Sequence, residues 1–118
     1  MAVLDEERVD ALFHALADRT RRDIMRRVLS GEHSVSTLAS KYDMSFAAVQ
    51  KHVTVLHAAG LVTKHRQGRE QLVRGDADTL RRATALLDQL AELWTDRLDR
   101  LGDALAAELD RLDEGSQR

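Results

Sequence analysis

The chain has 118 residues, a length that suits one domain. It contains no cysteine, which excludes disulfides, thiolate metal sites and cysteine nucleophiles. The formal net charge is −2, yet residues 1–74 carry 12 basic and 9 acidic side chains, while residues 75–118 carry 6 and 11. This distribution predicts a surface that binds a polyanion, followed by a separate acidic helix.

The N-terminal residues have neither the basic start nor the apolar stretch of a signal peptide. No apolar run approaches the roughly 20 residues of a membrane span. We therefore expect a cytoplasmic protein with no membrane partner. Proline is absent, which favours long helices over a turn-rich sheet. We expect neither an internal repeat nor a low-complexity segment.

Two helices are predicted at the start of the chain. The first covers residues 5–17, where apolar side chains recur at helical spacing, namely Val9, Leu12, Phe13 and Leu16. Acidic residues fill its first turn, where the helix dipole favours them. Asp18 is expected to cap a second helix that extends to Leu29 and stops at Gly31.

A helix-turn-helix is predicted over residues 36–59. Ser36 is expected to cap a short helix from Thr37 to about residue 41. Ser45 is expected to cap the next helix, which covers residues 46–59 and ends at Gly60. Two helices joined by so tight a turn are typical of this DNA-binding motif.

The second helix of this pair has two distinct faces. Val49, Val53 and Leu56 share the face expected to point inward. The opposite face is small or uncharged apart from one lysine, and consists of Ala47, Gln50, Lys51, Thr54 and Ala58. Such a face suits a DNA major groove, where glutamine reads a base edge and lysine meets a phosphate or a guanine. A plain solvated helix face is the alternative.

A β-hairpin is predicted over residues 61–74. Two strand-like stretches, residues 61–66 and 70–74, flank the tripeptide at 67–69, in which Gly68 supplies the positive φ of the turn. We expect this wing to contact DNA through Lys64, Arg66, Gln67 and Arg69. A charged surface turn is the alternative. We also expect Ser45 to contact DNA, because backbone N–H groups at the start of a helix favour phosphate.

A long helix is predicted over residues 78–113. Its apolar residues lie three or four apart, namely Leu80, Ala83, Leu87, Leu90, Trp94, Leu98, Leu101, Leu105, Leu109 and Leu112. A helix of about 50 Å exceeds what a small domain can cover, so the stripe needs a partner. We expect a homodimer interface formed by Leu12, Leu80, Leu87, Leu90, Trp94 and Leu98. Gly102 is a candidate kink.

Three stretches resemble the winged-helix domain of the ArsR-type regulator family. They are the run from Ala15 to Met25, the run from Ser45 to Val62 with its AGLV entry to the wing, and Gly68-Arg69-Glu70. The resemblance covers residues 9–75 well and the last helix more loosely. It implies a mainly α winged helix-turn-helix with a two-stranded wing and a C-terminal dimerisation helix. It also implies a dimeric bacterial repressor that leaves DNA when an effector binds.

The sequence departs from common forms of the family near the recognition helix. Arg19 stands where proline often opens the second helix, Phe46 and Ala47 where Gln-Pro is frequent, and Gln50 where serine is usual. These departures concern the operator sequence more than the fold. His52 matches the family, and we expect it either to contact a phosphate or to pack.

The resemblance also raises the question of a metal effector. Without cysteine, and with no histidine in residues 75–118, we expect no metal site and no cofactor. Trp94 resembles a tryptophan often found in a metal-free branch of the family. It is either a wall of a pocket for a small organic effector or a packing residue.

These observations together predict a DNA-binding transcription regulator. We expect a homodimeric repressor at a palindromic operator in double-stranded DNA. One alternative is a protein–protein interaction module on the same fold, although the paired arginines of the wing favour DNA. The other is a metal-responsive repressor. No catalytic set of residues is apparent, so we do not expect an enzyme.

Overall fold

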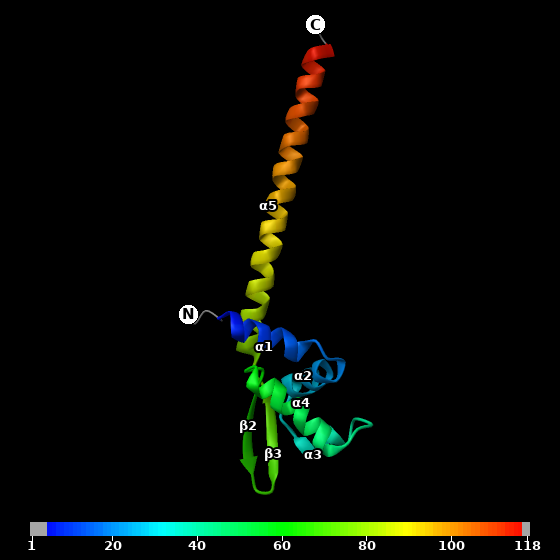
Figure 1. Ribbon diagram of the computed structural model, residues 1–118, viewed down its shortest axis with the longest axis vertical. Helices are drawn as coiled ribbons and strands as arrows, with labels where there is room; N and C mark the ends of the chain where they lie inside the picture. Colours follow the sequence, from blue (N-terminus) through cyan, green and yellow to red (C-terminus); the bar gives the residue numbers. More distant parts are fainter. Residues whose placement is uncertain (1–4, 117–118) are drawn as a thin grey trace. The chain divides into compact units, whose positions relative to one another are not determined.

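The computed structural model describes residues 5–116 (Figure 1). In chain order the elements are α1 (Glu6–Leu16), α2 (Arg19–Ser30), β1 (His33–Ser34), α3 (Val35–Ala39), α4 (Phe46–Ala58), β2 (Val62–Gln67), β3 (Glu70–Gly75) and α5 (Ala77–Ser116). The chain divides into two compact units, one up to Ala83 and one from Thr84 onward. We call residues 5–83 the winged unit and residues 84–116 the helical unit.

The winged unit is built around a core of aliphatic side chains. Helices α1, α2 and α4 each contribute a buried stripe, and the strands add further valines. The largest side chains that are fully buried are Leu12, Ile24, Leu38, Leu56, Leu61, Val28, Val49, Val53, Val62 and Val73. The expected inward face of α4 is therefore confirmed, whereas Phe13 of the stripe predicted for α1 is 38% exposed. Between residues 5 and 116 no helix combines the length and the apolar character needed to cross a membrane.

Polar side chains cap the first four helices. Asp5, Asp18, Ser34 and Ser45 each accept a hydrogen bond from the backbone N–H three residues ahead, at 2.8 to 3.1 Å. The caps expected at Asp18 and Ser45 are confirmed. The cap expected at Ser36 is wrong, because Ser34 caps α3 and the helix begins at Val35. This earlier start places Val35, which is 2% exposed, in the core.

The sheet has three strands in the order β1-β3-β2, where a two-stranded wing was predicted. The hairpin pairs Val62 with Gly75 and Gln67 with Glu70, which leaves Gly68 and Arg69 as its two-residue turn. Gly68 has a φ of 63°, so its expected positive φ is confirmed. The third strand is β1, which pairs His33 with Val73. Two residues are too short a stretch to show an alternating pattern, which is why the sequence does not reveal this strand.

Helix α5 is continuous over 40 residues, about 60 Å, and includes Gly102 in its interior. Gly102, the candidate kink of the sequence analysis, therefore does not break the helix. A single glycine weakens a helix without breaking it when its neighbours are good helix formers, such as Leu101, Ala104 and Leu105 here.

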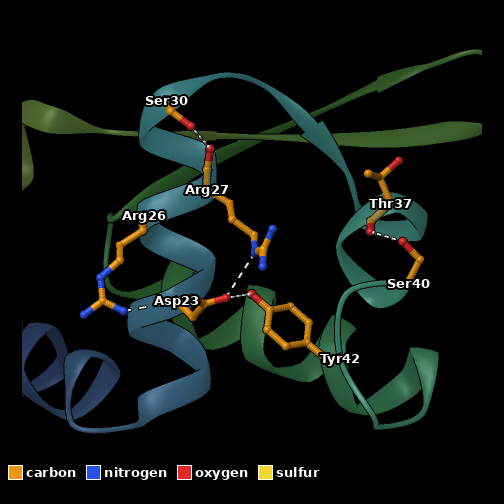
Figure 2. Close-up of polar contacts among 7 residues, drawn as sticks. All are labelled: Asp23, Arg26, Arg27, Ser30, Thr37, Ser40 and Tyr42. Carbon is orange, nitrogen blue, oxygen red and sulfur yellow. Dashed lines mark hydrogen bonds and ion pairs between the residues drawn. The ribbon is translucent and has the colours of Figure 1, made fainter.

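A polar cluster joins α2 to the turn of the helix-turn-helix (Figure 2). The Tyr42 hydroxyl donates a hydrogen bond of 2.6 Å to Asp23 Oδ2, and Arg27 Nε–H donates to the same oxygen at 3.0 Å. The Arg27 guanidinium also lies 5.7 Å from the centre of the Tyr42 ring. Because Tyr42 lies between α3 and α4, this cluster holds the turn against α2.

The cluster shifts the ionisation of its members. The hydrogen bond from Tyr42, followed by that from Arg27, lowers the pKa of Asp23. Burial, followed by the bond to Asp23, raises the pKa of Tyr42 to about 12. The folded protein therefore favours a charged aspartate and a neutral tyrosine at neutral pH.

Gly75 allows the end of β3 to approach α2 closely. A Cβ built at this position would lie 2.7 Å from Leu29 Cδ2 and 3.2 Å from the Leu29 Cα. The backbone contact matters most, because a flexible side chain can move aside and a helix backbone cannot.

We predict that Gly75→Ala lowers the free energy of unfolding by about 1–3 kcal/mol, the usual cost of overpacking. The matched control is Gly31→Ala, since a Cβ at Gly31 meets nothing within 4 Å. Urea unfolding followed by circular dichroism checks both variants. Equal stability of the two would contradict the close approach.

We predict that Tyr42→Phe destabilises the winged unit by about 1 kcal/mol at pH 7, through loss of the bond to Asp23. Since the pKa of Asp23 is lowered, its contribution is present above pH 4 and is lost as pH falls further. The difference between wild type and variant should therefore shrink at acid pH. The stability contributed by neutral Tyr42 is complete below pH 10 and is lost as pH rises through about 12. Unfolding curves at a series of pH values check both trends.

Candidate nucleic-acid interface

Helix α4 separates its residues into a buried and an exposed face. Val49, Val53 and Leu56 are 0–1% exposed, so they fix the rotation of the helix about its axis. The residues that the sequence analysis assigned to the outer face are all exposed, namely Ala47, Gln50, Lys51, Thr54 and Ala58. Phe46 and His57 of the same helix are exposed as well. No acidic residue lies within Phe46–Ala58. The outer face of α4 therefore has small residues, one amide and one cation.

Two hydroxyl groups on α4 are already engaged with its backbone. Ser45 Oγ accepts from the Ala48 N–H at 3.1 Å, so it serves as the N-cap. Thr54 Oγ1 donates to the Gln50 carbonyl at 2.9 Å, so its proton is not available to a ligand. Each oxygen keeps further hydrogen-bonding capacity, Ser45 as a donor and Thr54 as an acceptor.

The wing places its cations by strand alternation. Lys64 and Arg66 lie on the same face of β2 as the buried Val62, because residues two apart share a face. Gln67 lies on the other face, at the end of the strand, and Arg69 lies in the turn. All of these except the half-buried Lys64 are exposed. In Figure 1 the tip of the hairpin and α3 lie at the end of the winged unit away from α1.

His52 differs from the other candidate residues because its side chain is only 22% exposed and lies next to polar side chains of α2 and its cap. Arg21 Nη1–H donates a hydrogen bond of 3.2 Å to His52 Nδ1, and Asp18 Oδ2 lies 3.9 Å from the same nitrogen. A guanidinium has donors only, so Nδ1 of the neutral ring accepts and the ring proton resides on Nε2. Packing and ligand contact are therefore compatible roles for His52.

Arg21 connects three helices, and the sequence analysis did not single it out. Its Nε–H donates to the Ala15 carbonyl at 2.7 Å and its Nη2–H to the His14 carbonyl at 3.0 Å, both at the end of α1. Its third bond reaches His52 on α4. Arg21 lies within the run from Ala15 to Met25 that resembles the ArsR-type family. That run is the feature of the sequence that could have pointed to Arg21. The backbone N–H of Arg21 also lowers the pKa of Asp18, the cap of α2, and the positive charge of the Arg21 side chain contributes in the same direction.

The structure separates the expected interface residues into two groups. Leu12 is 1% exposed and belongs to the core of its own chain, so it offers no surface to a partner. Leu80 also packs against that core. Leu87, Leu90, Trp94 and Leu98 are 47–59% exposed on α5. Leu12 must therefore be removed from the predicted interface, because core packing of α1 requires it.

The described residues bear on the two kinds of effector site considered in the sequence analysis. Within residues 5–116 no group of three or more His, Asp or Glu side chains is arranged so that it could hold a metal ion. A cleft of about 460 Å³ lies in the winged unit, and its lining includes Arg8, His57, Asp76 and Arg82. Its lining is strongly charged and does not include Trp94.

Comparison with known proteins agrees with this architecture. The sequence model of the bacterial regulatory protein arsR family matches residues 18–64, which extend from the cap of α2 into β2. The chain is 41% identical over 71 residues to YuzN of Bacillus subtilis, an uncharacterized HTH-type transcriptional regulator. That match covers 54% of this chain and 77% of the relative.

Solved structures resemble the fold as well. An ArsR-like transcriptional regulator from a Rhodococcus species has a TM-score of 0.72 and 30% identity, over 80% of this chain and 90% of that one. A homodimeric winged helix-turn-helix DNA-binding domain from Mycobacterium bovis has a TM-score of 0.60 and 26% identity, over 78% and 91%. The identity to YuzN and the shared winged helix-turn-helix lead to one conclusion: the chain belongs to the ArsR family of bacterial regulatory proteins.

Proposed function

We propose that the protein is a cytoplasmic transcription regulator that binds double-stranded DNA as a homodimer. The observation that carries this proposal is the outer face of α4, which is exposed, small and without acidic residues, beside an arginine-bearing wing in the same unit. A small face allows close approach to base edges, and DNA attracts cations that flank it.

Each part of the interface has a proposed task. Gln50 reads a base edge in the major groove from the middle of the exposed face, and Ala47 and Thr54 line the same face. Ser45 and the first N–H groups of α4 hold a phosphate. Lys51 and His52 contact the backbone of the DNA, the latter through its Nε2–H. Lys64, Arg66, Gln67 and Arg69 extend the contact along the wing.

A two-fold symmetric dimer implies a palindromic operator. Self-association is supported by the homodimeric Mycobacterium bovis neighbour and by the exposed leucines of α5. We assign the interface to Leu87, Leu90, Trp94 and Leu98, with Leu80 at its border. Occupation of an operator within a promoter would make the protein a repressor.

We propose that no metal controls DNA release. The sequence has no cysteine, and residues 75–118 have no histidine, so the long helix lacks the ligands that transition metals prefer. If an effector exists, it is a small organic molecule. A pocket at Trp94 would need the partner subunit to close it, since Trp94 is 59% exposed in one chain.

Selection of binding sites from random DNA by the purified protein tests the proposed function. We expect a palindromic consensus. Recovery of sequences without any consensus, or no binding at low salt, would refute the proposal.

We predict that Arg69→Ala weakens binding to all DNA sequences alike, because the turn residue contacts phosphate. The slope of log K against log salt should fall by about two per dimer, one for each lost contact. The control is Arg100→Ala, which removes an equal charge from the helical unit and should leave the slope unchanged. Fluorescence anisotropy of labelled DNA at several salt concentrations measures both variants.

We predict that Gln50→Ala relaxes sequence preference at one position of each half-site, by about 1–3 kcal/mol. The salt slope should not change, since no cation is removed. Competition between the consensus and its single-base variants measures the preference. An unchanged preference at every position would remove Gln50 from base readout.

We predict that Leu90→Glu lowers self-association at least tenfold, because the charge would enter an apolar interface. Sedimentation velocity at protein concentrations of about 1 to 100 μM measures self-association, because this range suits a dimer with a micromolar Kd. The control is Gln89→Glu, the neighbouring residue on the outer face. A monomeric wild-type protein throughout this range would refute the dimer.

A further inference from the structure

One of the two phenylalanines of the chain lies on the surface, at the first residue of α4. Phe46 is 50% exposed, which is more than the other exposed large apolar side chains of the winged unit, Phe13 at 38% and Leu29 at 43%. Single apolar side chains are common on protein surfaces, so exposure by itself indicates no role. The position of Phe46, next to the face of α4 that is proposed to enter the major groove, is what distinguishes it.

The start of α4 has other residues that stabilise it. Ser45 Oγ accepts a hydrogen bond of 3.1 Å from the Ala48 N–H, which satisfies one of the free donors of the first turn. Met44, the residue before this cap, packs against the core to which Val49 belongs. An apolar residue at that place fixes the entry of the chain into a helix. The cap and the core therefore leave half of the Phe46 side chain in water.

Phe46 lies on the border between the two faces of α4. Viewed along the helix axis, it is about 20° from Val53 and about 40° from Gln50. Val53 is 1% exposed, so the exposure of Phe46 comes from its place along the axis, in the first turn. The Cα–Cβ bonds of a helix tilt toward its N-terminus. This geometry directs Phe46 toward the end of α4 that carries Ser45.

The N-terminal end is the part of a recognition helix that contacts base edges. In this chain it carries no charge, because residues 45–50 include neither a basic nor an acidic side chain. The nearest cation of the proposed interface is Lys51, in the second turn of α4. The first turn therefore presents an uncharged surface with one large apolar side chain.

The DNA major groove contains one apolar feature that such a side chain can contact, the C5-methyl group of thymine. The other groups exposed in the groove are hydrogen-bond donors and acceptors, and phenylalanine has neither. Contact between Phe46 and a thymine methyl would remove apolar surface of both from water. Cytosine carries only hydrogen at C5, so it would lose this contact.

The spacing of Phe46 and Gln50 predicts how the two bases that they contact are arranged. Residues four apart on a helix have Cβ atoms about 5–6 Å apart. Base pairs follow one another at about 3.4 Å, so the two side chains would contact positions about one or two base pairs apart. Glutamine is suited to adenine, with which it forms two hydrogen bonds. The expected half-site thus contains a thymine close to an adenine.

We propose that Phe46 is a specificity-determining residue that recognises the C5-methyl group of one thymine in the major groove of each half-site. The inference rests on the proposed DNA binding, and it adds a base that Gln50 does not select. The contact involves no charge, so its contribution to affinity should not depend on salt, unlike that of the wing. A 5-methylcytosine carries its methyl group at the same ring position and should be recognised in the same way.

Deoxyuridine substitution tests the inference, because it removes the methyl group of thymine and keeps the base pair. Each thymine of one half-site, in the operator obtained by site selection, is replaced in turn. At one of these positions we expect the affinity of the wild-type protein to fall about fourfold, as for one methyl group lost from an apolar contact. Replacement in both half-sites should lower the affinity about 15-fold. Fluorescence anisotropy of labelled DNA measures the affinities.

Three variants assign the effect to Phe46. Phe46→Ala should bind the thymine and deoxyuridine operators equally. Phe46→Gln should do the same, because an amide gains nothing from a methyl group. Phe46→Leu should keep part of the difference, since leucine is also apolar. Thermal unfolding of each variant confirms that it is folded, and we expect little change because the side chain is half exposed.

Two further variants are controls. Phe13→Ala makes the same substitution on α1, and Gln50→Ala removes the neighbouring side chain on α4. Both should keep the ratio of the affinities for thymine and deoxyuridine, whatever they do to the affinity itself. An effect of deoxyuridine on the shape or stiffness of DNA would persist in every variant, including Phe46→Ala. The comparison therefore separates direct contact from indirect readout.

Cytosine methylation provides the opposite change. Cytosine at the sensitive position should weaken binding of the wild-type protein, and 5-methylcytosine should strengthen it again by about fourfold. Phe46→Ala should not distinguish the two. Because both bases pair with guanine, the methyl group is the difference between them.

The outcomes separate this inference from the proposed function. If site selection yields a palindromic consensus and the wild-type protein tolerates deoxyuridine at every thymine, the inference is wrong and DNA binding stands. The exposure of Phe46 would then favour contact with another protein. Equal sensitivity of wild type and Phe46→Ala would also overturn the inference. Site selection without any consensus would refute the proposed function and the role of Phe46 together.

Discussion

The contact of Val49, Val53 and Leu56 with the core is the constraint on which the interface depends. Three fully buried side chains on one face leave α4 no choice of rotation, because any turn about its axis would expose them to water. The residues presented to solvent follow from this geometry. The recognition face is therefore specified by aliphatic packing on the opposite side of the same helix.

Polar contacts at the edges of the core complete this placement. Arg21 joins the end of α1 to His52 on α4, and Asp23 with Arg27 holds Tyr42 in the turn before α4. The contact of Arg21 with His52 lies within α4, and the contacts of Tyr42 lie before the first residue of that helix. Together they restrict translation of the helix along its axis, which apolar packing alone restricts less because it is not directional.

The sequence predicts what depends on local pattern. Periodicity identifies the buried face of α4, and cap chemistry identifies Ser45 and Asp18, because both signals reside in neighbouring residues. Strand β1 and the cap at Ser34 depend on pairing with β3, about 40 residues away, so no local pattern in the sequence predicts them. The same limit applies to Arg21 and to Leu12, whose roles depend on what folds against them.

The two-residue turn of the wing has a consequence for how this protein can change over evolutionary time. The turn at Gly68 and Arg69 fixes the register of β2 against β3, and this register keeps Lys64 and Arg66 on the face of Val62. Insertion or deletion of a single residue within β2 would transfer both cations to the opposite face. Changes of two residues would preserve the face and alter only the reach of the hairpin. Wings of related proteins that keep the same binding mode should therefore differ in strand length by even numbers.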